Sequence, residues 1–372
     1  MRQSARARIA AVGLATTGAL LLAGCGAANE VPTPVAAGAD VATELSGQIA
    51  GAGSSAQSAA MQAWIAGFTA VQPGVTVAYD PIGSGGGREQ FIAGGSDFGG
   101  TDAYLDEEEY AAALERCGGD NSVVEVPLYI SPIAIAYNLE GVEQLNLSPQ
   151  ALAGIFTQQI TNWNDPAIAA TNPGVELPDL PITPVNRSDE SGTTENFQEY
   201  LAAVAPEIWT YEVSGNWPIP GGAAAQGTSG VVGAIGAGNG TIGYADASQV
   251  GDLGVASIGV GGEFVAPTAE AASTVVQNSA RVEGRGSNSF AYDLARDTTE
   301  SGAYPIVLVS YNLACTTYDD PAVGEAVRAF LTYVAGDEGQ QVAAENAGSA
   351  PLSDELQELF QPAIDAIGTG GA

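Results

Sequence analysis

Three short segments combine glycine with small hydroxyl residues, and each stands directly before an expected helix: Gly51–Ser55, Ile82–Gly87 and Ser191–Thr193. The free backbone amides at a helix start carry partial positive charge and bind anions. Glycine lets the backbone approach the anion closely, and serine and threonine add neutral donors. Arg187, shortly before the third segment, adds a forked and permanently charged donor. Together these residues predict an oxyanion site.

Asp102 follows the second of these segments and, on charge alone, does not suit an anion site. It fits if the anion carries a proton that the carboxylate can accept, as phosphate does at neutral pH and sulfate does not. A buried acceptor left without a donor costs about 1–3 kcal/mol, so this residue favours phosphate over sulfate. Each feature has a simpler reading by itself, since glycine-rich turns reverse chains and Asp102 could cap a turn or a helix.

The elements that must position these residues alternate between strand and helix. Pro127 and Pro132 interrupt a β-rich stretch at 123–137, as expected for a crossing between domains. The alternation predicts an α/β fold with parallel strands, and 372 residues suffice for two lobes. The expected strands are 46–52, 75–79, 97–102, 182–186, 241–245 and 304–311; the expected helices include 61–71, 149–156, 166–170, 197–204, 230–238 and 323–335.

The charge balance excludes several function classes. Ten arginines, no lysine and no histidine stand against 43 acidic residues, and the net charge is −33. Such a chain repels nucleic acid. Without histidine, neither a Ser-His-Asp or Cys-His nucleophile nor a histidine-ligated zinc site can be built. We therefore predict no cofactor, no metal and no nucleic-acid partner.

The first 24 residues have the features of a targeting segment. Arg2, Arg6 and Arg8 precede an apolar stretch at 9–22 that is too short to span a membrane comfortably. It ends in Leu-Ala-Gly-Cys, which resembles a bacterial lipobox, so we predict a lipoprotein signal peptide at 1–24, lipidation of Cys25 and a flexible linker over 25–45. The alternative is an ordinary secretory signal with an incidental cysteine. The expected location is extracytoplasmic, on the outer face of the cytoplasmic membrane, with attachment through the lipid anchor only.

Two further cysteines, Cys117 and Cys315, lie far apart in the sequence. In the oxidising environment of an exported protein, a structural disulfide is the default expectation. The alternative is two isolated buried thiols.

The chain also resembles a known family over residues 46 to 355. The segments GAGSSAQSAAMQAWIAGF, YDPIGSGGGREQFIAGGSDFGGTDAYL, NRSDESGTTENFQEYL and GTIGYADAS resemble, in order and spacing, the phosphate-specific substrate-binding proteins of ABC importers, the PstS type. WNDPAIAATNPGVELP and YPIVLVSYNL match as well. The resemblance implies a type II periplasmic-binding-protein fold, with one lobe from 46–131 plus 260–372, the other from 132–259, and the ligand between them.

Matching motif to motif assigns the binding residues. The resemblance implies that Asp189 orients Arg187, and that Ala56, where the family has phenylalanine, binds through its backbone amide. It implies as partners inorganic phosphate and the membrane permease of an ABC importer with its cytoplasmic ATPases, and we expect a monomer. The predicted phosphate-binding residues are Ser54, Ser55, Ala56, Ser84, Asp102, Arg187, Ser191, Gly192 and Thr193.

Three alternatives remain open at this point. The ligand could be sulfate, molybdate or another oxyanion, against which Asp102 argues. Ser191 could be the nucleophile of a secreted phosphatase or esterase, although no histidine or lysine exists to activate it. The chain could also be a surface adhesin or antigen with a degenerate cleft.

Overall fold

The computed structural model describes residues 45–370, so Cys25, the predicted signal peptide and nearly all of the predicted linker lie outside the described residues. The strands are β1 Gly47–Gly53, β2 Val75–Asp80, β3 Phe98–Thr101, β4 Val123–Asn138, β5 Asn146–Leu147, β6 Thr183–Arg187, β7 Ala223–Ala225, β8 Thr241–Asp246, β9 Gly254–Val255, β10 Ser257–Val260, β11 Glu263–Val265, β12 Ala280–Arg281, β13 Tyr292–Asp293 and β14 Val307–Cys315. The helices are α1 Ser58–Val71, α2 Ser84–Ile92, α3 Glu107–Cys117, α4 Pro149–Phe156, α5 Pro166–Ala169, α6 Gly192–Val204, α7 Gly227–Ala237, α8 Ala269–Gln277, α9 Pro321–Ala335, α10 Asp337–Ala347 and α11 Asp354–Asp365, with a 3₁₀ turn at Ala247–Gln249.

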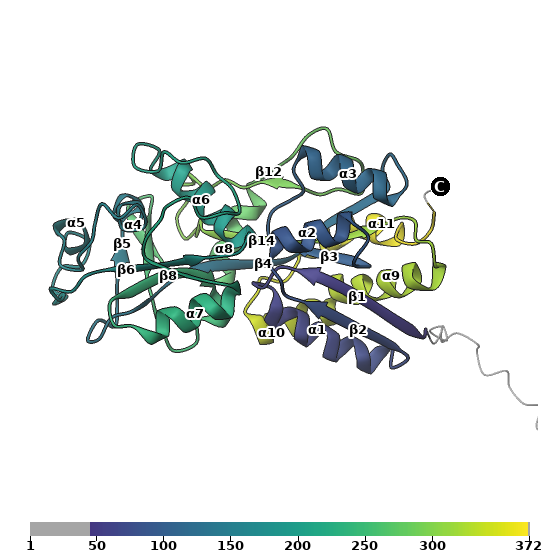
Figure 1. Cartoon of the computed structure of the whole chain (residues 1–372), viewed down its shortest axis with the longest axis horizontal. Coiled ribbons are helices and arrows are strands. Elements are labelled where there is room, and N and C mark those ends of the chain that lie inside the picture. Colours follow the sequence, from purple (N-terminus) through teal and green to yellow (C-terminus); the bar gives the residue numbers. More distant parts are fainter. Residues whose placement is uncertain (1–44, 371–372) are drawn as a thin grey trace, which may run out of the picture. The chain divides into compact units, whose positions relative to one another are not determined.

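One long strand, β4, extends through both parts of the main sheet (Figure 1). The strand order is β2-β1-β3-β14-β4-β8-β6-β7, and β9 pairs with β4 beside this path. Residues 123–132 of β4 pair with β14, and residues 133–138 pair with β8. We call β2, β1, β3 and β14 the first half-sheet, and β8, β6 and β7 the second half-sheet. The lobe boundaries predicted from the sequence stay predictions. The predicted boundary between residues 131 and 132 falls inside β4.

The strand directions confirm an α/β fold and correct one expectation. β1 runs parallel to β2 and β3, and β6 runs parallel to β7 and β8. β14, however, is antiparallel to β3 and β4, and β4 is antiparallel to β8. The expected parallel strands are therefore present in both half-sheets, but β14 and β4 depart from them, because the chain leaves the first half-sheet along β4 and returns beside it along β14.

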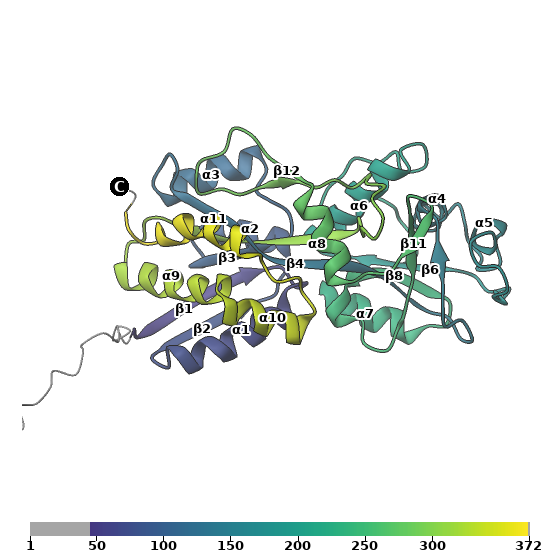
Figure 2. The same ribbon diagram turned by 180° about the vertical axis from the view of Figure 1, so that it is seen from behind.

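Helices cover both faces of the first half-sheet, with α1 and α10 on one face and α2 and α3 on the other (Figures 1 and 2). Met61, Trp64 and Phe68 recur at helical spacing in α1 and are buried. The indole of Trp64 donates to the carbonyl of Gly339 in α10 at 2.8 Å. This packing places the first turn of α1 at the end of β1.

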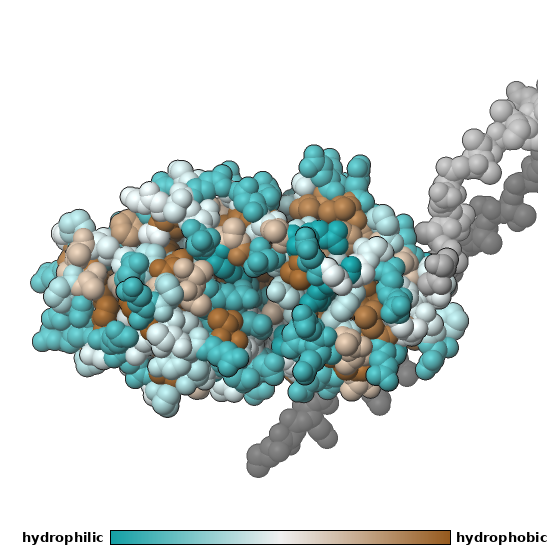
Figure 3. All heavy atoms as spheres, turned by 90° about the horizontal axis from the view of Figure 1, so that it is seen from above, coloured by the Kyte–Doolittle hydropathy of each residue, from teal (hydrophilic) through white to brown (hydrophobic). Residues whose placement is uncertain are grey.

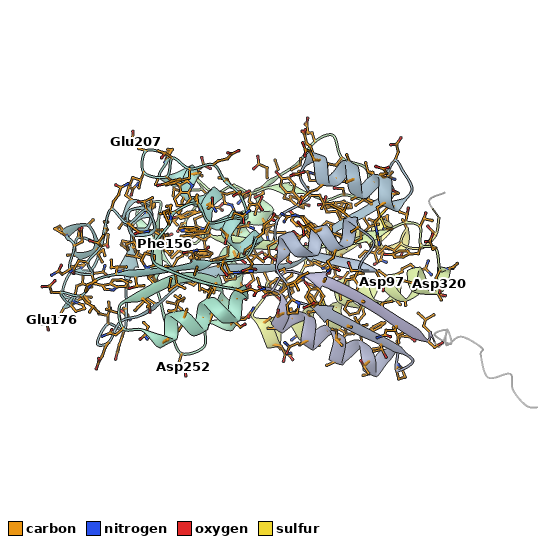
Figure 4. All side chains as sticks on the ribbon, in the orientation of Figure 1. Asp97, Phe156, Glu176, Glu207, Asp252 and Asp320 are labelled. Carbon is orange, nitrogen blue, oxygen red and sulfur yellow. A yellow bond between two sulfur atoms is a disulfide. The ribbon has the colours of Figure 1, made fainter. Side chains whose placement is uncertain are left out.

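The face of the molecule seen in Figure 3 is largely hydrophilic. On this face, hydrophobic residues form only small, separated patches (Figure 3). Acidic side chains such as Glu176, Glu207 and Asp252 are exposed, whereas Phe156 is buried (Figure 4). Within residues 45–370, no helix has the length and apolar character that a membrane crossing requires.

The predicted disulfide is confirmed: Cys117, at the end of α3, is bonded to Cys315, at the end of β14. Both cysteines are buried and pack with Phe91, Leu105 and Leu313. The bond therefore joins α3 to the central strands of the sheet.

Replacing both cysteines with serine should lower the free energy of unfolding by about 3 kcal/mol, because the bond closes a loop of 198 residues and restricts the unfolded chain. Urea unfolding of the variant and of the oxidised and reduced wild type measures this difference. Reduction should not destabilise the variant. Equal stability of oxidised and reduced wild type would contradict the expectation.

Candidate functional site

The predicted site residues lie where strands end and helices begin. β1 and β3 end next to Ser54 and Asp102, and β6 ends at Arg187. α2 begins at Ser84, and α6 begins at Gly192 with Ser191 as its N-cap. Parallel strands place their carboxyl ends at one edge of a sheet. Because β6 and β8 run opposite to β1 and β3, the carboxyl ends in the two half-sheets face each other, and loops from distant parts of the sequence meet between them.

Asp102 contacts residues from both half-sheets' loops, Ser84 at the start of α2 and Thr193 in α6. Its Oδ2 accepts hydrogen bonds from Ser84 Oγ at 3.3 Å and from Thr193 Oγ1 at 3.2 Å. Its backbone amide donates to Ser84 Oγ at 3.1 Å. A Cβ added at Gly192 would lie 2.8 Å from both the Cβ of Asp102 and Ser84 Oγ, so glycine is what lets the start of α6 come this close.

The second carboxylate oxygen of Asp102 is buried and has no hydrogen-bond partner among the described residues. Only 2 % of the residue is exposed. Burial raises the pKa of Asp102 above its usual value. The side-chain hydroxyls of Ser54 and of Ser310 on β14, together with the charge of Arg187, act to lower that pKa. A buried acceptor without a donor is costly, so this oxygen calls for a donor from a ligand.

Arg187 is buried and held by its neighbour Asp189. Its Nε donates to Asp189 Oδ1 at 2.8 Å, and its Nη2 donates to Asp189 Oδ2. The amide of Gly227, at the start of α7, also donates to Asp189 Oδ1, at 3.0 Å. Burial favours a raised pKa for Asp189, but Arg187 and the Gly227 amide outweigh burial and lower that pKa. The predicted role of Asp189 in orienting Arg187 agrees with this geometry.

Ser55 links the two half-sheets. Its Oγ lies 3.1 Å from Thr228 Oγ1 and accepts from the Thr228 amide at 3.1 Å. The side-chain Nε2 of Gln249 donates to the backbone carbonyls of Ser55 at 3.0 Å and Ala56 at 2.7 Å. The loop before α1 is therefore held by residues from α7 and from the turn after β8.

Two predicted hydroxyl donors also have local roles. Ser54 Oγ accepts from the backbone amides of Ala56 at 3.1 Å and Gln57 at 3.4 Å. The Ala56 amide, predicted to bind the anion, is thus engaged by Ser54 in this structure and would have to exchange that partner for the ligand. Ser191 Oγ accepts from the Thr194 amide at 3.2 Å and so caps α6. An accepting hydroxyl keeps its own hydrogen to donate, so both side chains can still serve an anion.

The set of groups that meet here can hold a tetrahedral oxyanion. It offers hydroxyls, helix-start amides and one guanidinium as donors, and a single carboxylate as acceptor. Among residues 45–370, no cluster of three or more acidic or cysteine side chains could hold a metal ion.

Comparison with known proteins gives consistent results. A profile of the PBP superfamily domain matches residues 38–338. The phosphate-binding protein PstS 3 of Mycobacterium leprae is 37 % identical over 376 residues, which cover 96 % of this chain and 98 % of that protein. The phosphate-binding protein PstS 3 of Mycobacterium tuberculosis is 38 % identical over 372 residues, with 96 % and 98 % covered. This chain belongs to the PstS family of phosphate-binding proteins.

Solved structures support the fold assignment of this PstS-family chain. A high-affinity periplasmic phosphate-binding protein (PfluDING), bound with phosphate, superimposes with a TM-score of 0.69 at 22 % identity, covering 85 % of this chain and 93 % of that one. A phosphate-binding protein from Stenotrophomonas maltophilia gives 0.64 at 19 % identity, with 85 % and 93 % covered. The predicted periplasmic-binding-protein fold with two lobes is confirmed. The named relatives are binding proteins, which agrees with our prediction that this PstS-family chain is not an enzyme.

Sequence reasoning missed several residues around this PstS-family site. Thr228, which contacts Ser55, belongs to a Gly-Thr-Ser-Gly run at the start of α7. That run has the same glycine and hydroxyl character as the three predicted segments, so it could have been found from the sequence. Gln249, Arg88 and Glu190 carry no such signal, because their partners lie far away in the sequence.

Proposed function

We propose that this protein captures inorganic phosphate between its two half-sheets, with Ser54, Ser55, Ala56, Ser84, Asp102, Arg187, Ser191, Gly192 and Thr193 as binding residues. The observation that carries the proposal is the unpartnered buried oxygen of Asp102 beside the donors Ser84 and Thr193. The P–O–H group of phosphate would supply the donor that this oxygen lacks, while Arg187 and the amides hold the remaining oxygens. The phosphate-binding activity named for the relatives supports the same ligand.

Selectivity follows from the same carboxylate. Sulfate brings no proton at neutral pH, so Asp102 would have to take one up before the two could share a hydrogen bond. Arsenate carries a proton, as phosphate does, and should bind. The net charge of −33 does not prevent binding, because local dipoles and one buried arginine act at short range while distant charges are screened by salt.

The test is calorimetric titration of ligand-stripped protein with phosphate, arsenate and sulfate at pH 7.5. Phosphate and arsenate should bind at one site per chain, and sulfate should not bind measurably. Equal affinity for sulfate and phosphate would overturn the assignment of Asp102. Binding of none of the three would overturn the proposed function.

We further propose that the protein is anchored outside the cytoplasmic membrane by lipid on Cys25 and, as a monomer, delivers phosphate to the permease of an ABC importer. The lipobox at Leu22–Cys25 and the family's role support this placement. In the native host, replacing Cys25 with serine should move the protein from the membrane fraction to the soluble fraction. Unchanged membrane attachment would contradict the anchor.

A further inference from the structure

A second buried arginine, Arg88 on α2, lies beside the proposed phosphate site without belonging to it. Only 5 % of the residue is exposed. Its Nε donates to Glu109 Oε1 at 2.7 Å, its Nη1 to Thr101 Oγ1 at 3.1 Å, and its Nη2 to Glu190 Oε1 at 2.9 Å. All three nitrogens of the guanidinium are therefore engaged.

These partners come from two separate parts of the fold. Thr101 ends β3 of the first half-sheet. Glu109 is in α3, which covers that half-sheet on the same face as α2 (Figure 1). Glu190 follows β6 of the second half-sheet and stands between Asp189 and Ser191. The ion pair between Arg88 and Glu190 thus crosses from one half-sheet to the other, right beside the residues proposed to bind phosphate. α2 lies at the end of the first half-sheet nearest the second (Figure 1).

The glycines at the start of α2 leave room for the 187–193 segment, because a side chain at either position would collide with it. A Cβ added at Gly83 would lie 2.6 Å from Asp189 Oδ2 and 2.9 Å from the carbonyl oxygen of Glu190. A Cβ added at Gly85 would lie 2.4 Å from the Cδ of Glu190. The Gly85 amide also donates to the Glu190 carbonyl at 3.4 Å. Part of the glycine-rich turn therefore makes room for the loop that follows β6 rather than for an anion.

The surroundings of Arg88 are otherwise strongly acidic. Burial raises the pKa of Glu195 on α6 to about 7, and the charge of Arg88 opposes this rise while Glu199 and Glu109 add to it. Three carboxylates face one another here: Glu109 in α3, Glu190 in the loop after β6 and Glu195 in α6. Without a cation between them, they would repel one another. Arg88 is the residue that turns this repulsion into attraction.

We propose that the Arg88–Glu190 ion pair is a latch that keeps the 187–193 segment on the start of α2 and so retains bound phosphate. Arg88 is a positioning residue here, because it acts through Glu190 on the adjoining Ser191 and does not touch the ligand. The proposal rests on the proposed phosphate-binding function. A contact made only when both half-sheets are together slows release of the ligand and leaves its rate of capture nearly unchanged.

The experiment measures phosphate association and dissociation rates by stopped flow for Glu190→Gln and for the matched control Glu109→Gln. Each variant removes one carboxylate charge from Arg88, but only Glu190 lies across the interface between the half-sheets. Glu190→Gln should raise the dissociation rate about five-fold with the association rate within two-fold. Glu109→Gln should leave both rates within two-fold of the wild type.

A second variant acts on the same contact from the other side. Gly85→Ala should displace the Glu190 side chain and raise the dissociation rate, and its effect should be less than additive with that of Glu190→Gln. Unchanged dissociation in Glu190→Gln, or an equal rise in Glu109→Gln, would overturn the latch while the wild type still binds phosphate. Failure of the wild type to bind phosphate would instead overturn the function, and the latch with it.

Discussion

Replacing Arg187 with glutamine should weaken phosphate binding by at least about 100-fold. Arg187 is buried, and it is the charged donor among the residues proposed to hold the anion. Hydrogen bonds between charged groups contribute about 1.5–3 kcal/mol each, and 2.7 kcal/mol corresponds to a factor of 100 in affinity. The substitution also removes the cation that pairs with Asp189, so an uncompensated negative charge would remain beside the anion. Calorimetric titration with phosphate measures the loss.

A suitable control is Arg328→Gln on α9, which removes one positive charge outside the proposed site and should change phosphate affinity less than two-fold. Thermal unfolding of both variants without ligand separates lost binding from lost folding. An Arg187→Gln protein that folds normally and binds phosphate within three-fold of the wild type would show that this guanidinium does not hold the ligand.

Local sequence patterns were sufficient to predict most of the elements that position the site. The spacing of Met61, Trp64 and Phe68 predicts α1, and the alternation at 75–79 predicts β2. The capping box of Asp106 and Glu109 could have predicted α3, which we did not anticipate. The antiparallel arrangement of β14 and β4 has no local signal, because it depends on the path of the chain between the half-sheets.

Some contacts of the site could likewise be predicted from local motifs, whereas others depend on residues far apart in the sequence. The convergence of Ser84, Asp102 and Thr193 follows from three motifs, since each stands at a strand end or a helix start where loops meet. The pairing of Arg88 with Glu190 spans 102 residues and joins two side chains that, in sequence, look like ordinary surface charges. The sequence can therefore predict which groups would bind an anion, but not which contacts would keep the site closed around it.

Replacing Asp102 with asparagine should stabilise the protein without ligand, and the effect should depend on pH. The folded-state pKa of Asp102 is raised above the usual value of 3.8, so the folded protein loses stability as pH rises above that value and this carboxyl ionises. Asparagine cannot ionise, so the variant should gain about 1–2 kcal/mol in the free energy of unfolding at pH 8 and nothing near pH 3. Urea unfolding at the two pH values measures the difference.

The same substitution should reduce the selectivity for phosphate over sulfate by about 10- to 100-fold, because an amide donates a hydrogen bond to sulfate without prior uptake of a proton. In the wild type, sulfate affinity should rise as pH falls, whereas in the variant it should stay nearly constant. The matched control is Asp246→Asn: Asp246 is also buried, burial raises its pKa to about 6, and Tyr129 and Ser248 hold it at the end of β8. Asp246→Asn should leave the selectivity ratio unchanged. If Asp102→Asn also left that ratio within two-fold of the wild type, the carboxylate would not be the group that tests the anion for a proton.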